Sequence, residues 1–199
     1  GTSIDILEGG AESEAALRAM GYTEQSSRAL RASQGAVACV VAERGMGHSV
    51  RSVAALPFSG TFYISIMFFR PGKANGTSLG GGYYMGVLGQ RAAQRVHLLS
   101  QSGGVTKNTD DLWVFNDGGD VRRNGTRERA PNEAKAANGR VFSVGDSVGH
   151  LVNMDTRTLV VYRNDVRVPG LTFTGLPAEL YLCATPSDAK SSVRIEMRA

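Results

Sequence analysis

Three histidines and two cysteines carry the side chains best suited to metal binding or nucleophilic catalysis in this sequence. His48, His97 and His150 lie far apart, and none has a second ligand residue at a metal-site spacing. Cys39 and Cys183 each lie in an apolar run and form no Cys-x-x-Cys pair. We therefore expect two buried free thiols, no zinc site and no cofactor. The alternating apolar residues around His150 predict a histidine in the core or on the sheet surface rather than a catalytic base.

The carboxylates and the glycine-rich stretch form no catalytic or nucleotide-binding motif either. Acidic residues lie almost entirely between the expected strands, whereas acid–base catalysis needs titratable groups that converge in a pocket. The stretch RPGKANGTSLGGG, residues 70–82, lacks the Gly-Lys-Ser or Gly-Lys-Thr of a phosphate-binding loop, and no helix follows it. Asn75 and Asn124 each begin an Asn-Gly-Thr glycosylation pattern, which we interpret as plain turns. We therefore expect a protein that is not an enzyme.

The basic residues outnumber the acidic residues only slightly, with 22 Lys and Arg, 18 Asp and Glu and a net charge of +4. Nucleic-acid-binding proteins concentrate basic residues on one face, so we expect no nucleic-acid partner. The densest basic run, DVRRNGTRER at residues 120–129, also contains Asp120 and Glu128. We interpret this run first as a solvated loop, with a patch for an anionic partner as the alternative. No apolar run is long enough to cross a bilayer, so no membrane association is expected.

Helical sequence is confined to the N-terminal part of the chain. Residues 11–33 are rich in Ala, Leu, Glu and Arg, and their apolar residues indicate two short helices. From residue 35 onward, short apolar runs with a period of two alternate with Gly, Pro, Asn and Asp. This pattern predicts an all-β antiparallel β-sandwich at residues 34–199 and a helical extension at residues 1–33. It predicts no helix after residue 35.

The clearest strand pattern is VGDSVGHLVNMDTRTLVVYRNDVRVPG, from residue 144 to residue 170. Apolar side chains alternate with others from Val148 to Met154, which places the apolar set on one face of a strand. Two polar breaks follow, and the second contains Asn164 and Asp165, which tolerate the positive φ angles of a tight turn. The stretch therefore predicts a three-stranded antiparallel meander.

The order of motifs over residues 34–199 resembles that of the SPRY domain family. GDSVGHLVNMDTRTLVVYRNDV resembles the family's pattern from Gly-Asp through Gly-x-Leu to a turn Asn-Gly, although Asp165 replaces the turn glycine. VRSVAALPFSGTFYISIMFF, YYMGVLGQ and FNDGG resemble the family's earlier strands and its Asp-Asp-Gly turn. LYL resembles its final Leu-Tyr-Pro, with Leu182 in place of the proline. The resemblance implies a concanavalin A-like β-sandwich that binds other proteins without catalysis.

In SPRY domains a protein partner, often a short peptide, binds loops at one end of the sandwich, so the resemblance implies such a partner here. By correspondence, the loops are ERGMGHS at residues 43–49, the segment 90–111 and TPSDAKSS at residues 185–192. Rigid sheets position such loops while the loop sequences remain free to vary. For Trp113, packing in the core is the alternative to an aromatic binding anchor. The expected partner-binding residues are Arg44, Met46, His48, Trp113, Pro186, Asp188 and Lys190.

Two further interpretations stay open at this point. SEAALRAMGYTEQSSRALRASQGAVACVV resembles a ubiquitin-associated domain through its Met-Gly-Tyr, which implies ubiquitin as a partner of residues 11–44 and an adaptor role. The period of two over residues 36–43 favours a strand there instead. A carbohydrate-binding, lectin-like sandwich is the second alternative, because lectins share this architecture. No signal peptide opens the chain, so a cytoplasmic or nuclear location is expected.

Overall fold

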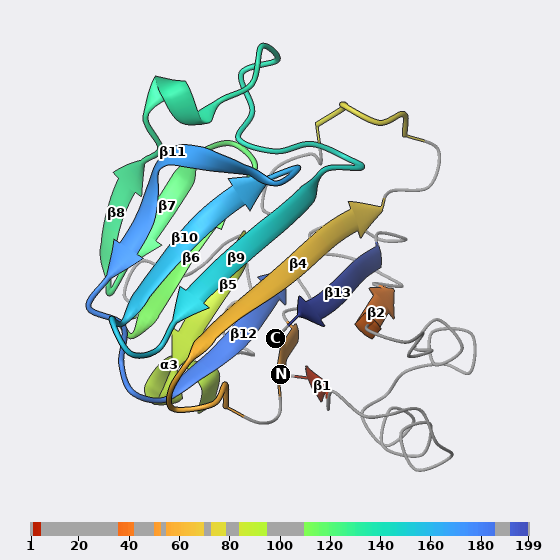
Figure 1. Ribbon diagram of the computed structural model, residues 1–199. Helices are drawn as coiled ribbons and strands as arrows, with labels where there is room; N and C mark the ends of the chain where they lie inside the picture. Colours follow the sequence, from red (N-terminus) through yellow and green to blue (C-terminus); the bar gives the residue numbers. More distant parts are fainter. Residues whose placement is uncertain are drawn as a thin grey trace, which may run out of the picture.

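The computed structural model describes residues 2–4, 36–41, 50–52, 55–69, 73–78, 84–94, 110–185 and 192–198. Within these ranges, strands form two sheets, and the helical segments are α3 (Gln90–Gln94) and the 3-10 turn η2 (Asn132–Ala134) (Figure 1). No helix among the described residues is both long and apolar enough to span a membrane. The chain is therefore built mainly from strands, as the period of two predicts.

Seven strands form the first sheet. They are β1 (Thr2–Ile4), β3 (Val50–Ser52), β5 (Tyr84–Gly89), β6 (Leu112–Asn116), β7 (Asp120–Arg123), β8 (Thr126–Arg129) and β12 (Leu180–Thr185). Their order across the sheet is β1-β3-β12-β5-β6-β7-β8. All neighbours are antiparallel except β1 and β3, which are parallel. β8 therefore lies at one edge of this sheet.

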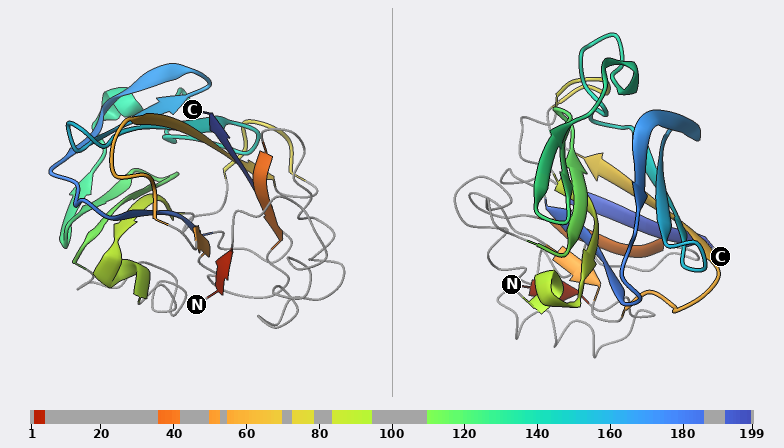
Figure 2. Two further views of the ribbon diagram at one scale, coloured as in Figure 1. Left: turned by 60° about the horizontal axis from the view of Figure 1, so that its bottom comes forward. Right: turned by 90° about the vertical axis from the view of Figure 1, so that its left-hand side faces the viewer.

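Six strands form the second sheet. They are β2 (Ala36–Val41), β4 (Thr61–Phe69), β9 (Ser147–Asn153), β10 (Thr158–Arg163), β11 (Val166–Thr174) and β13 (Ser192–Arg198). Their order is β11-β10-β9-β4-β13-β2, and every pair of neighbours is antiparallel. The two turned views show this sheet facing the first across the core, which is the layering of a β-sandwich (Figure 2).

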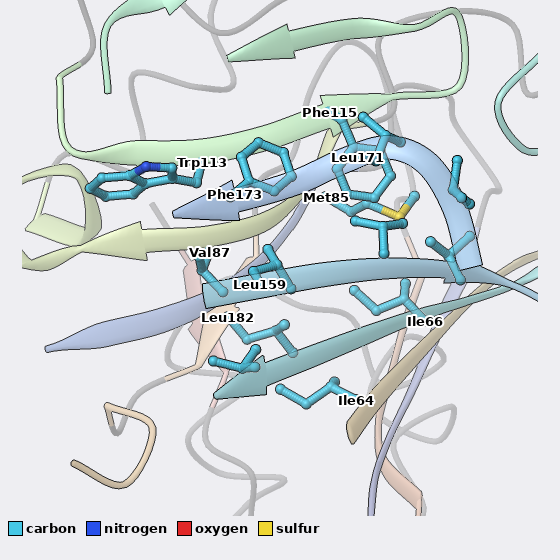
Figure 3. Close-up of a cluster of buried hydrophobic side chains, with 14 of the residues drawn as sticks. Ile64, Ile66, Met85, Val87, Trp113, Phe115, Leu159, Leu171, Phe173 and Leu182 are labelled. Carbon is cyan, nitrogen blue, oxygen red and sulfur yellow. The ribbon is translucent and has the colours of Figure 1, made fainter. Parts of the chain in front are cut away.

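The core lies between the two sheets and is filled from both sides. Ile64 and Ile66 of β4 and Leu159 of β10 come from one sheet, and Met85 and Phe115 come from the other (Figure 3). Each of these side chains is at most 1% exposed. Burying an aliphatic or aromatic side chain of this size contributes about 1.5–3 kcal/mol, so this layer supplies most of the drive to fold.

The predicted three-stranded meander is confirmed as β9, β10 and β11. Val148, Val152 and Met154 are at most 1% exposed and face the core together, as their spacing predicts. Asn164 and Asp165 form the β10–β11 turn with φ angles of 50° and 63°. Both residues have the left-handed conformation that this turn requires, so aspartate serves where a glycine is usual.

His150 of β9 lies in the core, which is one of the two placements predicted for it. It is 0% exposed, and its ring lies 5.6 Å from that of Phe115, with the two planes inclined by 30°. Burial lowers the pKa of His150 to about 4, because the imidazolium form would lose its hydration. The imidazole is therefore neutral at physiological pH. Cys183 is buried, as expected. Cys39 belongs to β2, whose side chains lie outside the described residues.

Three elements differ from the sequence-based expectations. Residues 120–129 form the β7–β8 hairpin rather than a solvated loop, with Asp120 4% and Arg122 8% exposed. Helix α3 follows β5, although no helix was expected after residue 35. Strand β1 lies within the segment expected to be a helical extension, while residues 11–33 lie outside the described residues. The hairpin was missed because buried charges interrupt its apolar pattern.

Candidate functional site

The strand register shows which loops share an end of the sandwich. Thr185 at the end of β12 pairs with Tyr84 at the start of β5, which pairs with Asn116 at the end of β6. In the other sheet, Ser192 at the start of β13 pairs with Val41 at the end of β2. We call this the upper end, because β4 and β10 point towards it in Figure 1. The opposite end, where β5 leads into α3, is the lower end.

Two of the three predicted loops connect strands at the upper end. Residues 42–49 join Val41 of β2 to Val50 of β3, and Val50 pairs with Ala184 near the end of β12. Residues 186–191 join β12 to β13. Most of the predicted binding residues belong to these two segments and lie outside the described residues, so their role stays a prediction. They are Arg44, Met46, His48, Pro186, Asp188 and Lys190.

The third predicted loop, residues 90–111, belongs to the lower end. Gly89 at the end of β5 pairs with Leu180, where β12 begins. The amide of Gly89 donates to the carbonyl of Asp111 at 2.8 Å, so the segment leaves and rejoins the sheet at the same place. The expectation that all three loops share one end is therefore wrong for this segment. The end at which this segment lies relative to β12 depends on the antiparallel pairing of β5 with β12, which are distant in sequence, and motif order alone could not show this.

Trp113 lies on β6, beside the lower end, with its side chain in the core. It is 5% exposed and belongs to the main apolar cluster, and it pairs in register with Val87 of β5 (Figure 3). This placement agrees with the core-packing alternative given above for this residue. The binding role of Trp113 stays a prediction.

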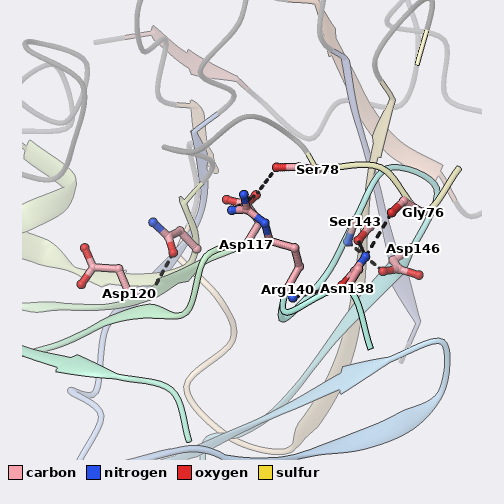
Figure 4. A network of polar contacts seen from close by, with 9 residues as sticks. Gly76, Ser78, Asp117, Asp120, Asn138, Arg140, Ser143 and Asp146 are labelled. Carbon is pink, nitrogen blue, oxygen red and sulfur yellow. Dashed lines mark hydrogen bonds and ion pairs between the residues drawn. The ribbon is translucent and has the colours of Figure 1, made fainter. Parts of the chain in front are cut away.

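The described part of the upper end centres on Asp117, in the turn between β6 and β7. The amide of Gly119 donates to the carbonyl of Asn116 at 3.1 Å, and Gly119 has a φ of 85° that favours glycine. Asp117 is 0% exposed, and its Oδ2 lies 3.5 Å from Nη1 of Arg140 and 3.5 Å from Oγ of Ser78 (Figure 4). Within the described ranges, its Oδ1 is buried without a hydrogen-bond partner.

Burial is the main influence on the Asp117 carboxyl. It raises the pKa of Asp117 above the ordinary value, while Arg140 lowers it again in part. The positive charge of Arg140 therefore offsets only part of the cost of burying the Asp117 carboxylate. Ser78, Asp117 and Arg140 come from three different connecting segments, so this contact links the loops of one sheet to those of the other.

Hydrogen bonds join the 73–78 segment to residues 138–144. Asn138 donates from Nδ2 to the carbonyl of Gly76 at 3.1 Å and to Oγ of Ser143 at 2.9 Å (Figure 4). The amide of Gly76 donates to the carbonyl of Val144 at 2.9 Å, and the amide of Val144 donates to the carbonyl of Thr77 at 3.0 Å. The two segments are thereby fixed to each other along their backbones.

Asp146 and Asn164 connect the same frame to the meander. The amide of Ser143 donates to Oδ2 of Asp146 at 2.8 Å, and Nδ2 of Asn164 donates to its Oδ1 at 2.8 Å. Asn164 in turn accepts from the amide of Ser147 at 2.9 Å. These contacts explain why the sequence motif has Asp146 and Asn164. Their side chains hold the start of β9 against the β10–β11 turn.

The arrangement provides a polar frame that links the connecting segments of the upper end. In the described ranges, no three His, Cys, Asp or Glu side chains gather to hold a metal ion. Asp117 is fully buried, so a substrate would not reach its carboxylate in this conformation. Sequence reasoning missed Ser78, Asn138 and Arg140 because they come from irregular segments without periodicity. The frame lies beside the strand ends that hold residues 42–49 and 186–191.

No family model and no curated protein matches this sequence. Among solved structures, the SPRY domain of human HERC1 matches 83% of this chain and 89% of its own, at 15% identity and a TM-score of 0.53. A human SPRY domain matches 84% of this chain and 94% of its own, at 17% identity and a TM-score of 0.47. The molecule is thus an antiparallel two-sheet β-sandwich. Its fold is that of SPRY domains, which confirms the resemblance seen in the motifs.

The resemblance of residues 11–44 to a ubiquitin-associated domain gains no support. Residues 36–41 form β2, which pairs with β13, whereas the resemblance needs a third helix there. One segment cannot be both a paired strand and a helix. The neighbouring residues 11–35 lie outside the described residues.

Proposed function

We propose that this chain is a non-catalytic protein-interaction domain that binds a protein or a short peptide at the upper end of its sandwich. The observation that carries the proposal is the strand register, which brings the flanks of residues 42–49 and 186–191 together at one end. The SPRY fold supports the general role, since SPRY domains bind proteins or peptides. An adaptor role in which the domain recruits a partner follows from the same proposal.

Contacts among the described connecting segments of the upper end support the rigidity that such binding needs. The Asp117–Arg140 contact and the Asn138–Gly76 hydrogen bond hold the connecting segments of the upper end together. A binding surface on a fixed frame loses less conformational entropy when the partner docks, and this raises affinity. The loops themselves are then free to differ in sequence and to set the choice of partner.

Within the two loops, each residue type has a proposed role. Arg44 pairs with an acidic group or a main-chain carbonyl of the partner, and Met46 provides an adaptable apolar contact. Asp188 and Lys190 add charge selectivity. His48 and Pro186 complete the proposed surface. We place the domain inside the cell, because two cysteines in separate apolar runs are typical of an intracellular protein.

A selected peptide tests this proposal. A phage-displayed peptide library is panned against the chain, and the best peptide is measured against Arg44→Ala, Met46→Ala and Asp188→Ala. We expect each substitution to weaken binding by about 1 kcal/mol or more while the melting temperature stays unchanged. Phe58→Ala is the matched control, because Phe58 is 69% exposed in the loop before β4, at the lower end. Equal binding by all loop variants, or a loss confined to Phe58→Ala, would overturn the assignment.

A further inference from the structure

The β7–β8 hairpin separates its charged residues between two faces. Val121 faces the core and pairs with Glu128. Side chains alternate along a strand, so the neighbouring positions Asp120 and Arg122 of β7 face outward, as do Arg127 and Arg129 of β8. Asp120 pairs in register with Arg129, and Arg122 pairs with Arg127. The outward face of this small hairpin therefore carries three arginines and one aspartate, an excess of two positive charges.

The single aspartate of this face is already satisfied by its neighbours. Oδ1 of Asp120 accepts from Nε of Arg127 at 2.9 Å. Oδ2 accepts from the hydroxyl of Tyr84 at 2.6 Å and from Nη2 of Arg122 at 3.4 Å. Burial and the bond to Asp120 raise the pKa of Tyr84 to about 12, so the phenol keeps its proton and its donor role. Asp120 is 4% exposed and is shielded from an approaching anion.

The inward face is electrically balanced. Nε of Arg123 lies 3.1 Å from a carboxylate oxygen of Glu128, and Nη1 of Arg123 donates to the carbonyl of Thr172 at 2.9 Å. The guanidinium carbon of Arg123 also lies 4.9 Å from the centre of the Phe173 ring. Arg123 is therefore used within the fold, and the excess charge of the hairpin belongs to its outward face.

Free donor capacity remains on Arg127 and Arg129. The Arg127 side chain is 54% exposed and uses only Nε for Asp120, which leaves its two terminal nitrogens available. Arg129 is exposed and has no ion pair within the described ranges. Behind them, Nε of the buried Arg122 has no hydrogen-bond partner among the described residues. Arginine forks of this kind bind carboxylates through two parallel hydrogen bonds.

The position of the two arginines matches an extended chain. Arg127 and Arg129 lie two residues apart on β8, so their backbones are separated by about 7 Å along the strand. An extended peptide repeats its side chains on one face with the same spacing. Among the described strands, β8 pairs only with β7, which leaves its outer edge for an added strand.

We propose that the outward face and edge of β8 bind an extended acidic segment of a protein partner, with carboxylates at alternate positions facing Arg127 and Arg129. This surface is distinct from the loops of the proposed function. A second copy of β8 paired with Arg127 opposite Arg129 would place arginine against arginine, which is unfavourable. Two free arginines on a four-residue strand are too few for the wide basic footprint of a nucleic-acid site.

Binding of labelled peptides to the full chain, measured by fluorescence anisotropy, tests the proposal. The probe is a six-residue peptide that alternates Thr and Glu, and the control peptide has the same composition with its three Glu in one block. We expect the alternating peptide to bind more tightly and Arg129→Gln to weaken it about tenfold, as loss of one charge-assisted contact does. Arg129 is exposed, so this variant should fold normally.

Arg167→Gln is the matched control, because Arg167 is an exposed arginine on β11 in the other sheet. It should leave binding unchanged. Equal binding of the two peptides, or equal weakening by Arg167→Gln, would show a general charge effect and overturn the proposal. Preferential binding of a single-stranded RNA hexamer or of a phosphoserine peptide would overturn the choice of an acidic segment. Amide shifts confined to residues 120–129 in the labelled chain would support it.

Discussion

Asp117 and Arg140 meet at 3.5 Å across two connecting segments, with the carboxylate fully buried and the guanidinium partly exposed. The contact joins the β6–β7 turn of one sheet to the segment that leads into β9 of the other. A buried carboxylate that loses its cation keeps its desolvation penalty, so this contact matters more than an exposed ion pair does. It links connecting segments of the two sheets at the upper end.

Removal of Arg140 should therefore destabilise the chain. Arg140→Ala leaves Asp117 buried without a cation, and we expect a loss of about 1–3 kcal/mol in the free energy of unfolding. Urea denaturation at neutral pH measures this loss. Arg140→Lys keeps the positive charge and should recover part of the stability. Identical midpoints for Arg140→Ala and the unmodified chain would contradict the role given to this contact.

His150 predicts a specific dependence of stability on pH. Its folded pKa of about 4 lies below the ordinary 6.5, so the unfolded chain binds a proton first as the pH falls. Above pH 6.5, His150 is neutral in both states and does not affect the free energy of unfolding. Between pH 6.5 and 4, its protonation in the unfolded chain should lower the free energy of unfolding by about 3 kcal/mol. His150→Leu should remove this component, which urea titrations across the range would detect. An unchanged pH slope in His150→Leu would contradict the account.

Arg123 of β7 should prove important for holding the two sheets together near the edges formed by β8 and β11. It donates to the carbonyls of Thr172 at 2.9 Å and Gly170 at 3.3 Å, across the gap between the sheets. Arg123→Ala should lower the free energy of unfolding by about 2–4 kcal/mol, because the hydrogen bonds and the contact with Phe173 are lost together. Glu128→Ala removes only the ion pair of Arg123 and should cost much less. Equal losses in the two variants would argue against the bridge.

Gly86 should tolerate no side chain. A Cβ there would lie 2.2 Å from the carbonyl oxygen of Trp113 on the neighbouring strand, and its φ is 145°. Backbone atoms cannot move aside easily in a paired strand, so Gly86→Ala should cost about 3 kcal/mol or more. Gly139→Ala, where nothing lies within 4 Å and φ is 73°, should cost about 1 kcal/mol. Similar melting temperatures for the two variants would contradict the β5–β6 register.

Periodicity predicted the parts of this fold in which apolar residues alternate without interruption. Strands β9 to β11 and the burial of His150 followed from that pattern. The β7–β8 hairpin did not, because Asp120 and Arg122 occupy positions where an apolar residue signals a strand. Their burial depends on mutual pairing in three dimensions, which sequence spacing does not reveal.

The frame of the upper end was not predictable for a different reason. Ser78, Asp117 and Arg140 belong to segments without regular structure, and they meet only because the sheet order brings distant strands together. The pairing of β5 with β12, which are distant in sequence, likewise shows that residues 90–111 leave the sheet where β12 begins, at the lower end. Sequence motifs therefore identified the fold, whereas the grouping of loops required the strand register.

The most direct test of the central claim is amide chemical-shift mapping of a selected peptide on the isotope-labelled chain. Our account predicts that the shifts gather at the upper end, in residues 42–49 and 186–191, and extend to the frame around Asp117. Shifts concentrated at the lower end, in residues 55–60 and 154–157, would contradict it.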